Sequence, residues 1–71
     1  MAVFAKTLVR GCHVRSFQIQ EVPEAGWIAS QETDWQITHR RWYTDWHRVE
    51  RTTIRYMREV AELRHEGWIE A

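Results

Sequence analysis

The densest group of chemically active side chains in this sequence lies between His39 and Arg51. Its first ten residues read HRRWYTDWHR and combine basic with aromatic side chains. The arginine guanidinium binds phosphate and carboxylate oxygens with two parallel hydrogen bonds, and aromatic rings are platforms on which nucleobases stack. We therefore predict a surface that binds single-stranded nucleic acid or another anion, with these candidate residues: His39, Arg40, Arg41, Trp42, Tyr43, Arg48 and Arg51.

The same segment has a second interpretation, in which its large side chains are structural. Trp46 and one of Trp42 or Tyr43 would then belong to the core, and the arginines would form a solvated helix face. Basic charge is concentrated locally, because residues 39–58 carry six basic and two acidic side chains while the whole chain has a net charge of zero. Affinity for nucleic acid depends on how many phosphates are neutralised, so the neutral chain as a whole disfavours strong binding.

Residues that support catalysis or metal binding are sparse. Cys12 and His13 are adjacent, so in a strand they point to opposite faces. Cys12 with a histidine, or Asp45 with His47 and Glu50, offers an enzymatic alternative with a pocket at an oligomer interface. The sequence has no established metal-ligand spacing, no glycine-rich phosphate loop and no hydrolase motif. We predict a non-enzymatic protein without a metal or cofactor.

The length of the chain predicts one small domain, 1–71, that is marginally stable as a monomer. Small folds usually rely on disulfides, a metal or a partner chain. Cys12 is the only cysteine, so a disulfide within the monomer is excluded and a homodimer or higher oligomer is expected. The single cysteine and the lack of a long apolar run favour a cytoplasmic protein that does not contact membranes.

The first half of the chain predicts antiparallel strands within about 3–41. Apolar and polar residues alternate over 14–22, where Phe17 and Ile19 share one face. The turn residues of VPEAG follow, and WIASQETDW then reads as the returning strand. A third strand is expected over 35–41, and the N-terminal VFAKTLVR is either a fourth strand or an arm that lies on a neighbouring chain.

The second half predicts one long helix over about 45–66. Thr44 is a suitable N-cap, and Gly67 is a suitable left-handed residue just after the helix. Trp68 would then pack on Leu63, as in a Schellman ending. The predicted fold class is therefore α+β, with a three- or four-stranded antiparallel sheet followed by one long C-terminal helix packed on one face.

The apolar arc of this helix covers about 180°, which is wider than one sheet face requires. Glu50 and Arg64 interrupt the arc and are equidistant from Met57, so an antiparallel pair of helices would set each against the other. The alternative is that the charges form pairs within one helix, such as Arg55 with Glu59. Our candidates for an oligomer interface are Trp46, Glu50, Ile54, Met57, Val60, Arg64 and Trp68.

The segment EVPEAGWIA, residues 21–29, is similar to the first hairpin of HicB-type antitoxins, which hold a toxin with a small sheet-and-helix domain. The resemblance is confined to this hairpin, because QETDWQ replaces the segment with Pro and Gly that follows in those antitoxins. It implies a sheet edge that pairs with another protein. Our leading prediction is a small non-enzymatic interaction module that acts as a homo-oligomer, with anion binding as the alternative and an enzyme third.

Overall fold

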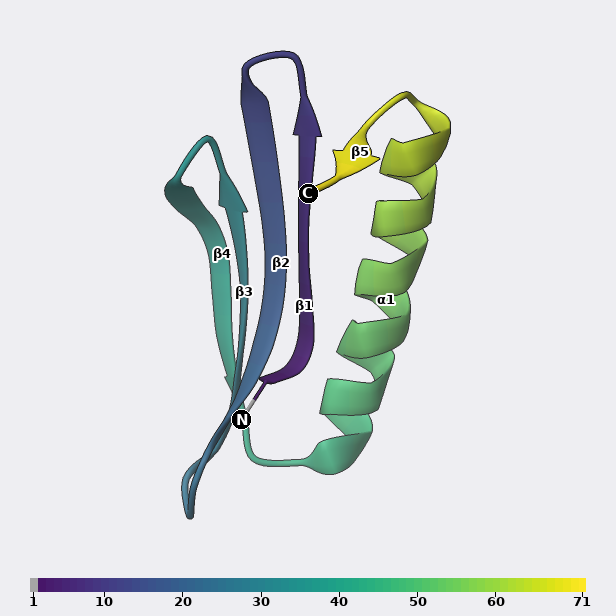
Figure 1. Ribbon diagram of the computed structural model, residues 1–71. Coiled ribbons are helices and arrows are strands. Elements are labelled where there is room, and N and C mark those ends of the chain that lie inside the picture. The colour runs from purple at the N-terminus through teal and green to yellow at the C-terminus, as the bar shows by residue number, and fades with distance from the viewer. Residues whose placement is uncertain (1) are drawn as a thin grey trace.

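Five strands and one helix follow each other along residues 2–71, which the computed structural model describes: β1 (Ala2–Arg10), β2 (His13–Val22), β3 (Gly26–Thr33), β4 (Gln36–Tyr43), α1 (Trp46–His65) and β5 (Ile69–Glu70). The strands form one antiparallel sheet in the order β4-β3-β2-β1-β5. The helix packs along one face of this sheet (Figure 1). The predicted α+β class, with its antiparallel sheet and C-terminal helix, is confirmed.

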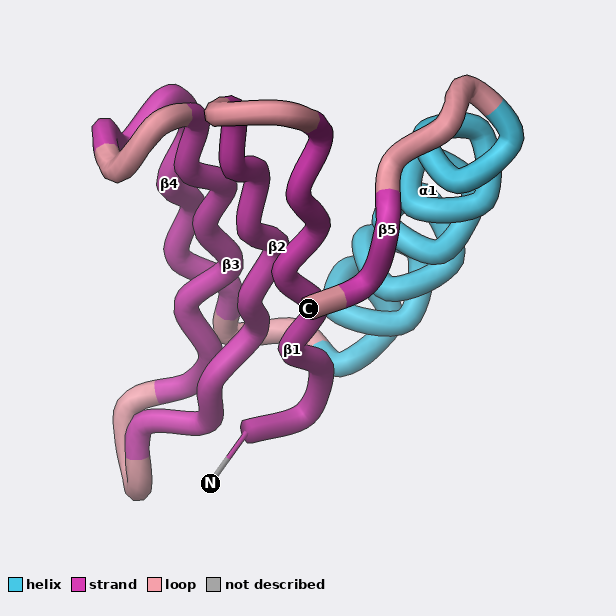
Figure 2. The backbone as a smooth tube through the Cα atoms, turned by 45° about the horizontal axis from the view of Figure 1, so that its top comes forward, coloured by secondary structure: helices cyan, strands magenta, loops and turns pink. Residues whose placement is uncertain are grey.

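The N-terminal segment is a full strand of the sheet, which decides between the two predicted alternatives. β1 pairs with β2 from Ala2 opposite Gln20 to Arg10 opposite His13. The short strand β5 was not predicted, and it pairs with the free edge of β1 at the opposite side of the sheet from β4 (Figure 2). An ion pair between Lys6 and Glu70 joins β1 and β5.

The core lies between the sheet and α1. Phe17 and Ile19 of β2 are fully buried on the face that the helix covers, as their alternation predicts. The Phe17 ring packs against the Tyr56 ring of α1, with 5.3 Å between the ring centres. The complete set of buried core residues is Leu8, Phe17, Ile19, Ala29, Val49, Tyr56, Val60 and Leu63.

Hydrogen bonds close both ends of α1. The N-cap is Asp45 and not Thr44, because Asp45 has the extended backbone of a cap and its carboxylate accepts a hydrogen bond from the His47 amide at 3.0 Å. At the other end, the Trp68 amide donates to the Leu63 carbonyl at 2.9 Å, which is the predicted Schellman bond. Within residues 2–71, no helix combines the length and the apolar character needed to cross a membrane.

The strand that leads into α1 differs from the prediction. Asp34 and Trp35 form the turn between β3 and β4, with positive φ angles of 51° and 70°, so Trp35 does not begin a strand. Two successive positive φ angles match the twist of a two-residue hairpin. β4 instead starts at Gln36 and continues to Tyr43, beyond the predicted end at 41. The basic segment before the helix is therefore largely a strand.

Candidate anion-binding site

A cleft of about 430 Å³ opens between α1 and the part of the sheet formed by β3 and β4. α1 begins next to β4 and ends next to β5, so it passes from one sheet edge to the other (Figure 1). The cleft lies beside the first half of the helix. It is lined by Gln31, His39, Arg41, Tyr43, Arg48, Arg51, Thr52 and Arg55.

The sheet wall of the cleft follows from the alternation of β4. His39, Arg41 and Tyr43 are alternate residues of this strand, so they share the face that α1 covers. Arg40 and Trp42 fall between them and belong to the opposite face of the sheet. Alternation thus divides the basic stretch into residues that line the cleft and residues on the opposite face of the sheet.

A β-bulge near Thr38 sets which residues of β4 line the cleft. Gln31 pairs with His39, whereas the next residue of β3, Glu32, pairs with Ile37. Because Gln31 and Glu32 point to opposite faces, His39 and Ile37 also point to opposite faces. Without the extra residue, the odd-numbered positions would all share one face. The bulge therefore keeps Ile37 out of the cleft.

The helix wall of the cleft follows from the helical period. Arg48, Arg51, Thr52 and Arg55 are spaced three or four residues apart and so lie on one flank of α1. Thr52 is buried, and its hydroxyl donates to the Arg48 carbonyl at 2.8 Å. The Arg55 guanidinium lies 5.9 Å from the centre of the Tyr56 ring, a cation–π contact that orients it.

Positive charge in the cleft is not balanced by neighbouring carboxylates. The lining contains four arginines and one histidine, and no Asp or Glu from the described residues 2–71. The two ion pairs found in that range, Lys6 with Glu70 and His13 with Asp34, involve none of these arginines. An anion in the cleft would therefore meet several guanidinium groups that form no ion pair with a carboxylate of residues 2–71.

Tyr43, which lines the cleft, and Tyr56, which lies in the adjacent core, have pKa values shifted in opposite directions. Partial burial raises the pKa of Tyr43, but the neighbouring polar groups of Thr52 and Arg55 and the positive charges of Arg55 and Arg41 lower it by more, so the net shift is downward. Burial raises the pKa of Tyr56, and nearby Gln31 offsets only part of that effect. Tyr43 therefore responds to the positive charge of the cleft.

The structure brings together five of the seven residues predicted for anion binding: His39, Arg41, Tyr43, Arg48 and Arg51. Gln31, Thr52 and Arg55 also line the cleft, although the sequence did not predict them as site residues. Arg55 follows Arg48 by seven residues on the same helical flank, so the helical period could have identified it. Gln31 could not be found in this way, because it comes from another strand.

The residues predicted for an oligomer interface divide into three groups. Val60 is buried in the core, and Trp68 packs against that core. Trp46 is half-exposed, and its ring lies 5.4 Å from the Trp27 ring. The remaining four are exposed on α1: Glu50, Ile54, Met57 and Arg64.

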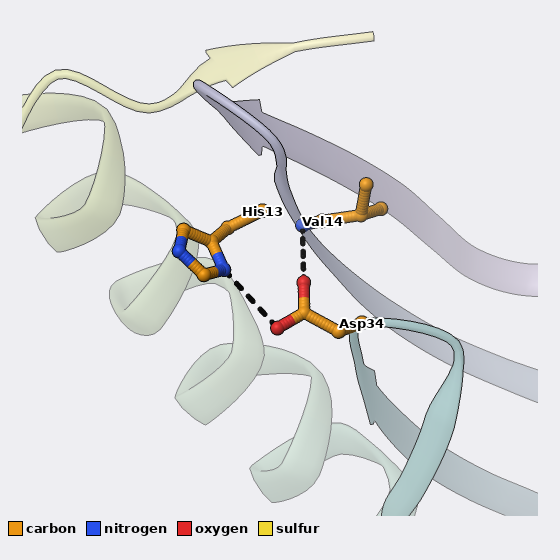
Figure 3. A network of polar contacts seen from close by, with 3 residues as sticks. All are labelled: His13, Val14 and Asp34. Carbon is orange, nitrogen blue, oxygen red and sulfur yellow. Dashed lines mark hydrogen bonds and ion pairs between the residues drawn. The ribbon is translucent and has the colours of Figure 1, made fainter.

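A second polar cluster, at the other end of the β3–β4 hairpin, is structural. The Asp34 carboxylate accepts a hydrogen bond from the Val14 amide at 3.0 Å and lies 3.1 Å from Nδ1 of His13 (Figure 3). These contacts join the turn between β1 and β2 to the turn between β3 and β4. Cys12 is exposed beside them, and no three His, Cys, Asp or Glu side chains within residues 2–71 are grouped as metal ligands.

Comparisons with protein-family models, with curated proteins and with solved structures found no match to this chain. Function is therefore inferred from the geometry and the charge of the cleft.

Proposed function

We propose that this protein is a non-enzymatic binding module that holds a phosphate-bearing anion in the cleft between β4 and α1. The observation that carries the proposal is the convergence of Arg41, Arg48, Arg51 and Arg55 on one cleft without an acidic neighbour in its lining. Guanidinium groups match the geometry of phosphate oxygens and form charge-assisted hydrogen bonds with them. His39 and Tyr43 add further polar groups to the same cleft.

Phosphate suits this site better than a single carboxylate does. A phosphate group presents three or more acceptor oxygens, so it can engage guanidinium groups from both walls at once, whereas a carboxylate has two oxygens. The cleft volume of about 430 Å³ also falls within the range of small-molecule sites. The chain has no net charge, so the attraction is confined to the cleft and is expected to weaken as salt is added.

Single-stranded nucleic acid is a second candidate for the source of the phosphate. A second pocket at the start of α1 shares Tyr43 and Arg48 with the cleft and also contains Trp42, Thr44 and Asp45. The Trp42 side chain is 50% exposed, so its ring is accessible for stacking with a base. A cationic groove beside an aromatic platform is the usual composition of single-strand binding sites.

The experiment compares pyrophosphate with a labelled single-stranded oligonucleotide, by calorimetry and by fluorescence anisotropy, at two salt concentrations. We expect the double variant Arg48→Gln/Arg51→Gln to bind either ligand at least about tenfold more weakly, because each charge-assisted hydrogen bond contributes roughly 1.5–3 kcal/mol. The matched control is Arg58→Gln, which changes an exposed arginine of α1 outside the cleft and should alter affinity by less than about twofold.

The two sources of phosphate are separated by Trp42→Ala. Loss of oligonucleotide affinity with unchanged pyrophosphate affinity would identify nucleic acid as the ligand. Unchanged affinity for both would favour a small phosphorylated molecule. Absence of binding to either ligand at low salt, or equal losses in the Arg58→Gln control, would contradict the proposed function.

A further inference from the structure

A stripe of exposed residues follows α1 on a different flank from the cleft. Its members are spaced three or four residues apart, so they lie within roughly 80° around the helix axis. At its centre, Ile54 and Met57 are 52% and 56% exposed, although both are large apolar residues. The stripe consists of Glu50, Ile54, Met57, Ala61 and Arg64, all of them exposed.

The charges of this stripe are symmetric about its centre. Glu50 precedes Met57 by seven residues and Arg64 follows it by seven. We propose that two copies of the chain dimerise by pairing these stripes antiparallel, with the two-fold axis at Met57. Such a pairing is isologous and sets each Glu50 opposite Arg64 of the partner subunit, while Ile54 and Met57 cover one another.

The structure narrows the interface that the sequence predicts. Val60 and Trp68 belong to the core side of the molecule and are not part of the stripe. Ala61 is added, because it is exposed between Met57 and Arg64 and its small side chain permits close approach of a second helix. Half-exposed Trp46 continues the same flank at the start of α1.

Charge along the whole helix favours the antiparallel arrangement. The first half of α1 carries three arginines and one glutamate, with no acidic residue in its first turn, whereas the second half carries two of each. Arg48 in the first turn opposes the helix dipole, which favours acidic residues near the N-terminus. In an antiparallel pair, the basic half of each helix lies beside the neutral half of the other, whereas a parallel pair would set the two basic halves side by side.

This dimer is independent of the proposed anion site. Arg48, Arg51 and Arg55 lie roughly 120–180° around the helix from Met57, so pairing through the stripe leaves both clefts accessible. A contact limited to one helix from each subunit falls in the small class of interfaces, below about 1,200 Å² in total. We therefore expect a weak dimer that dissociates on dilution.

The test uses reciprocal charge reversal and sedimentation equilibrium over a wide range of protein concentration. Glu50→Lys and Arg64→Glu should each weaken self-association by roughly tenfold or more, since each places two like-charge pairs in the dimer. An equimolar mixture of the two variants should form a heterodimer of at least wild-type affinity, because both cross-chain pairs become attractive again. Pull-down of an untagged variant by its tagged counterpart measures this recovery.

Controls separate the interface from effects within one chain. Glu62→Lys reverses an exposed charge of α1 outside the stripe and should leave association unchanged. Arg64 also helps to lower the pKa of Glu70, so Arg64→Glu changes a contact inside the subunit, but this change cannot produce selective heterodimers. In a Cys12→Ser background, Met57→Cys should yield a disulfide-linked dimer on oxidation.

Two results would overturn the proposal. One is a wild-type protein that stays monomeric at the highest concentrations measured. The other is that both charge variants still form homodimers and that their mixture does not favour the heterodimer. Association would then take place through another surface, such as the free edge of β4.

Discussion

The two flanks of α1 differ in how their surfaces are made. The basic flank faces β3 and β4, so the arginines of the helix share a concave cleft with side chains of the sheet. The flank centred on Met57 is exposed and consists of helix residues alone. A concave surface made by two elements can surround a small anion, whereas a convex helical stripe can be covered only by another large surface.

This difference also explains why the two flanks depend differently on the rest of the fold. The cleft requires the register of β4, because the bulge near Thr38 directs His39 toward α1 and Ile37 away from it. The stripe requires only that α1 be helical and docked through its buried residues, Val49, Tyr56, Val60 and Leu63. The cleft should therefore be more sensitive to changes in the sheet than the stripe is.

The largest expected effect comes from the core that supports both flanks. Phe17→Ala should lower the free energy of unfolding by about 3–5 kcal/mol, because the buried ring is lost and a cavity remains beside Tyr56. A total stability of about 5–15 kcal/mol is typical, so anion binding and dimerisation should decline together. The measurement is chemical denaturation followed by circular dichroism.

Met57→Ala is the control for Phe17→Ala, because it removes a large apolar side chain that is exposed and not buried. It should change the stability of the monomer by about 0.5 kcal/mol or less. If Met57→Ala instead costs as much as Phe17→Ala in dilute protein, the exposed stripe contributes to the monomer core and the contrast between the flanks is wrong.

An intermediate effect concerns the ionisation of Tyr43, which reports on the basic flank alone. Its lowered pKa means that it should ionise before an ordinary tyrosine as the pH rises, whereas Tyr56 should ionise later. Arg55→Gln, or an anion bound in the cleft, should raise the pKa of Tyr43, because less positive charge then stabilises the phenolate. Ultraviolet titration of tyrosinate, with Tyr43→Phe to assign the signal, measures these shifts.

The sign of the linked stability effect follows from the direction of the Tyr43 shift. Because its pKa is lower in the folded state, ionisation of Tyr43 adds stability that is fully present above the unfolded pKa of about 10 and is lost as the pH falls through the folded value. Dimerisation should not move this titration. A shift that depends on protein concentration without added anion would couple the two flanks.

The smallest expected effect lies at the hairpin turn that is remote from both flanks. A hydrogen bond from the Val14 amide, and then the contact with His13, lower the pKa of Asp34 (Figure 3). The stability from this carboxylate is present above its unfolded pKa and is lost as the pH falls through its folded pKa. Asp34→Asn should therefore make thermal stability less dependent on pH between about pH 5 and about pH 2.

The Asp34→Asn variant also serves as a negative control for the comparison. Its turn residue does not line the cleft and is not on α1, so anion affinity and self-association at neutral pH should stay within about twofold of wild type. If anion affinity fell by more than this while self-association stayed unchanged, the turn would be shown to position the start of β4.

Local patterns predicted much of the fold, and the reason is that they reflect short-range backbone geometry. Alternation placed Phe17 and Ile19 on the buried face of β2, and Gly67 correctly marked the end of α1. The N-cap was displaced by one residue, because Thr44 and Asp45 are both good caps and only the backbone conformation distinguishes them. β5 was missed because a two-residue strand has no period of its own.

The candidate site was predicted by residue type and only partly by position. The sequence by itself determined that basic and aromatic residues surround the start of a helix, since composition and helical period are properties of the chain. Only the tertiary structure decided that Arg41 and Arg48 line the cleft while Arg40 and Trp42 do not, and that Gln31 joins them. That selection depends on strand register, on a bulge and on the path of α1 across the sheet, which are set by packing between residues distant in the sequence.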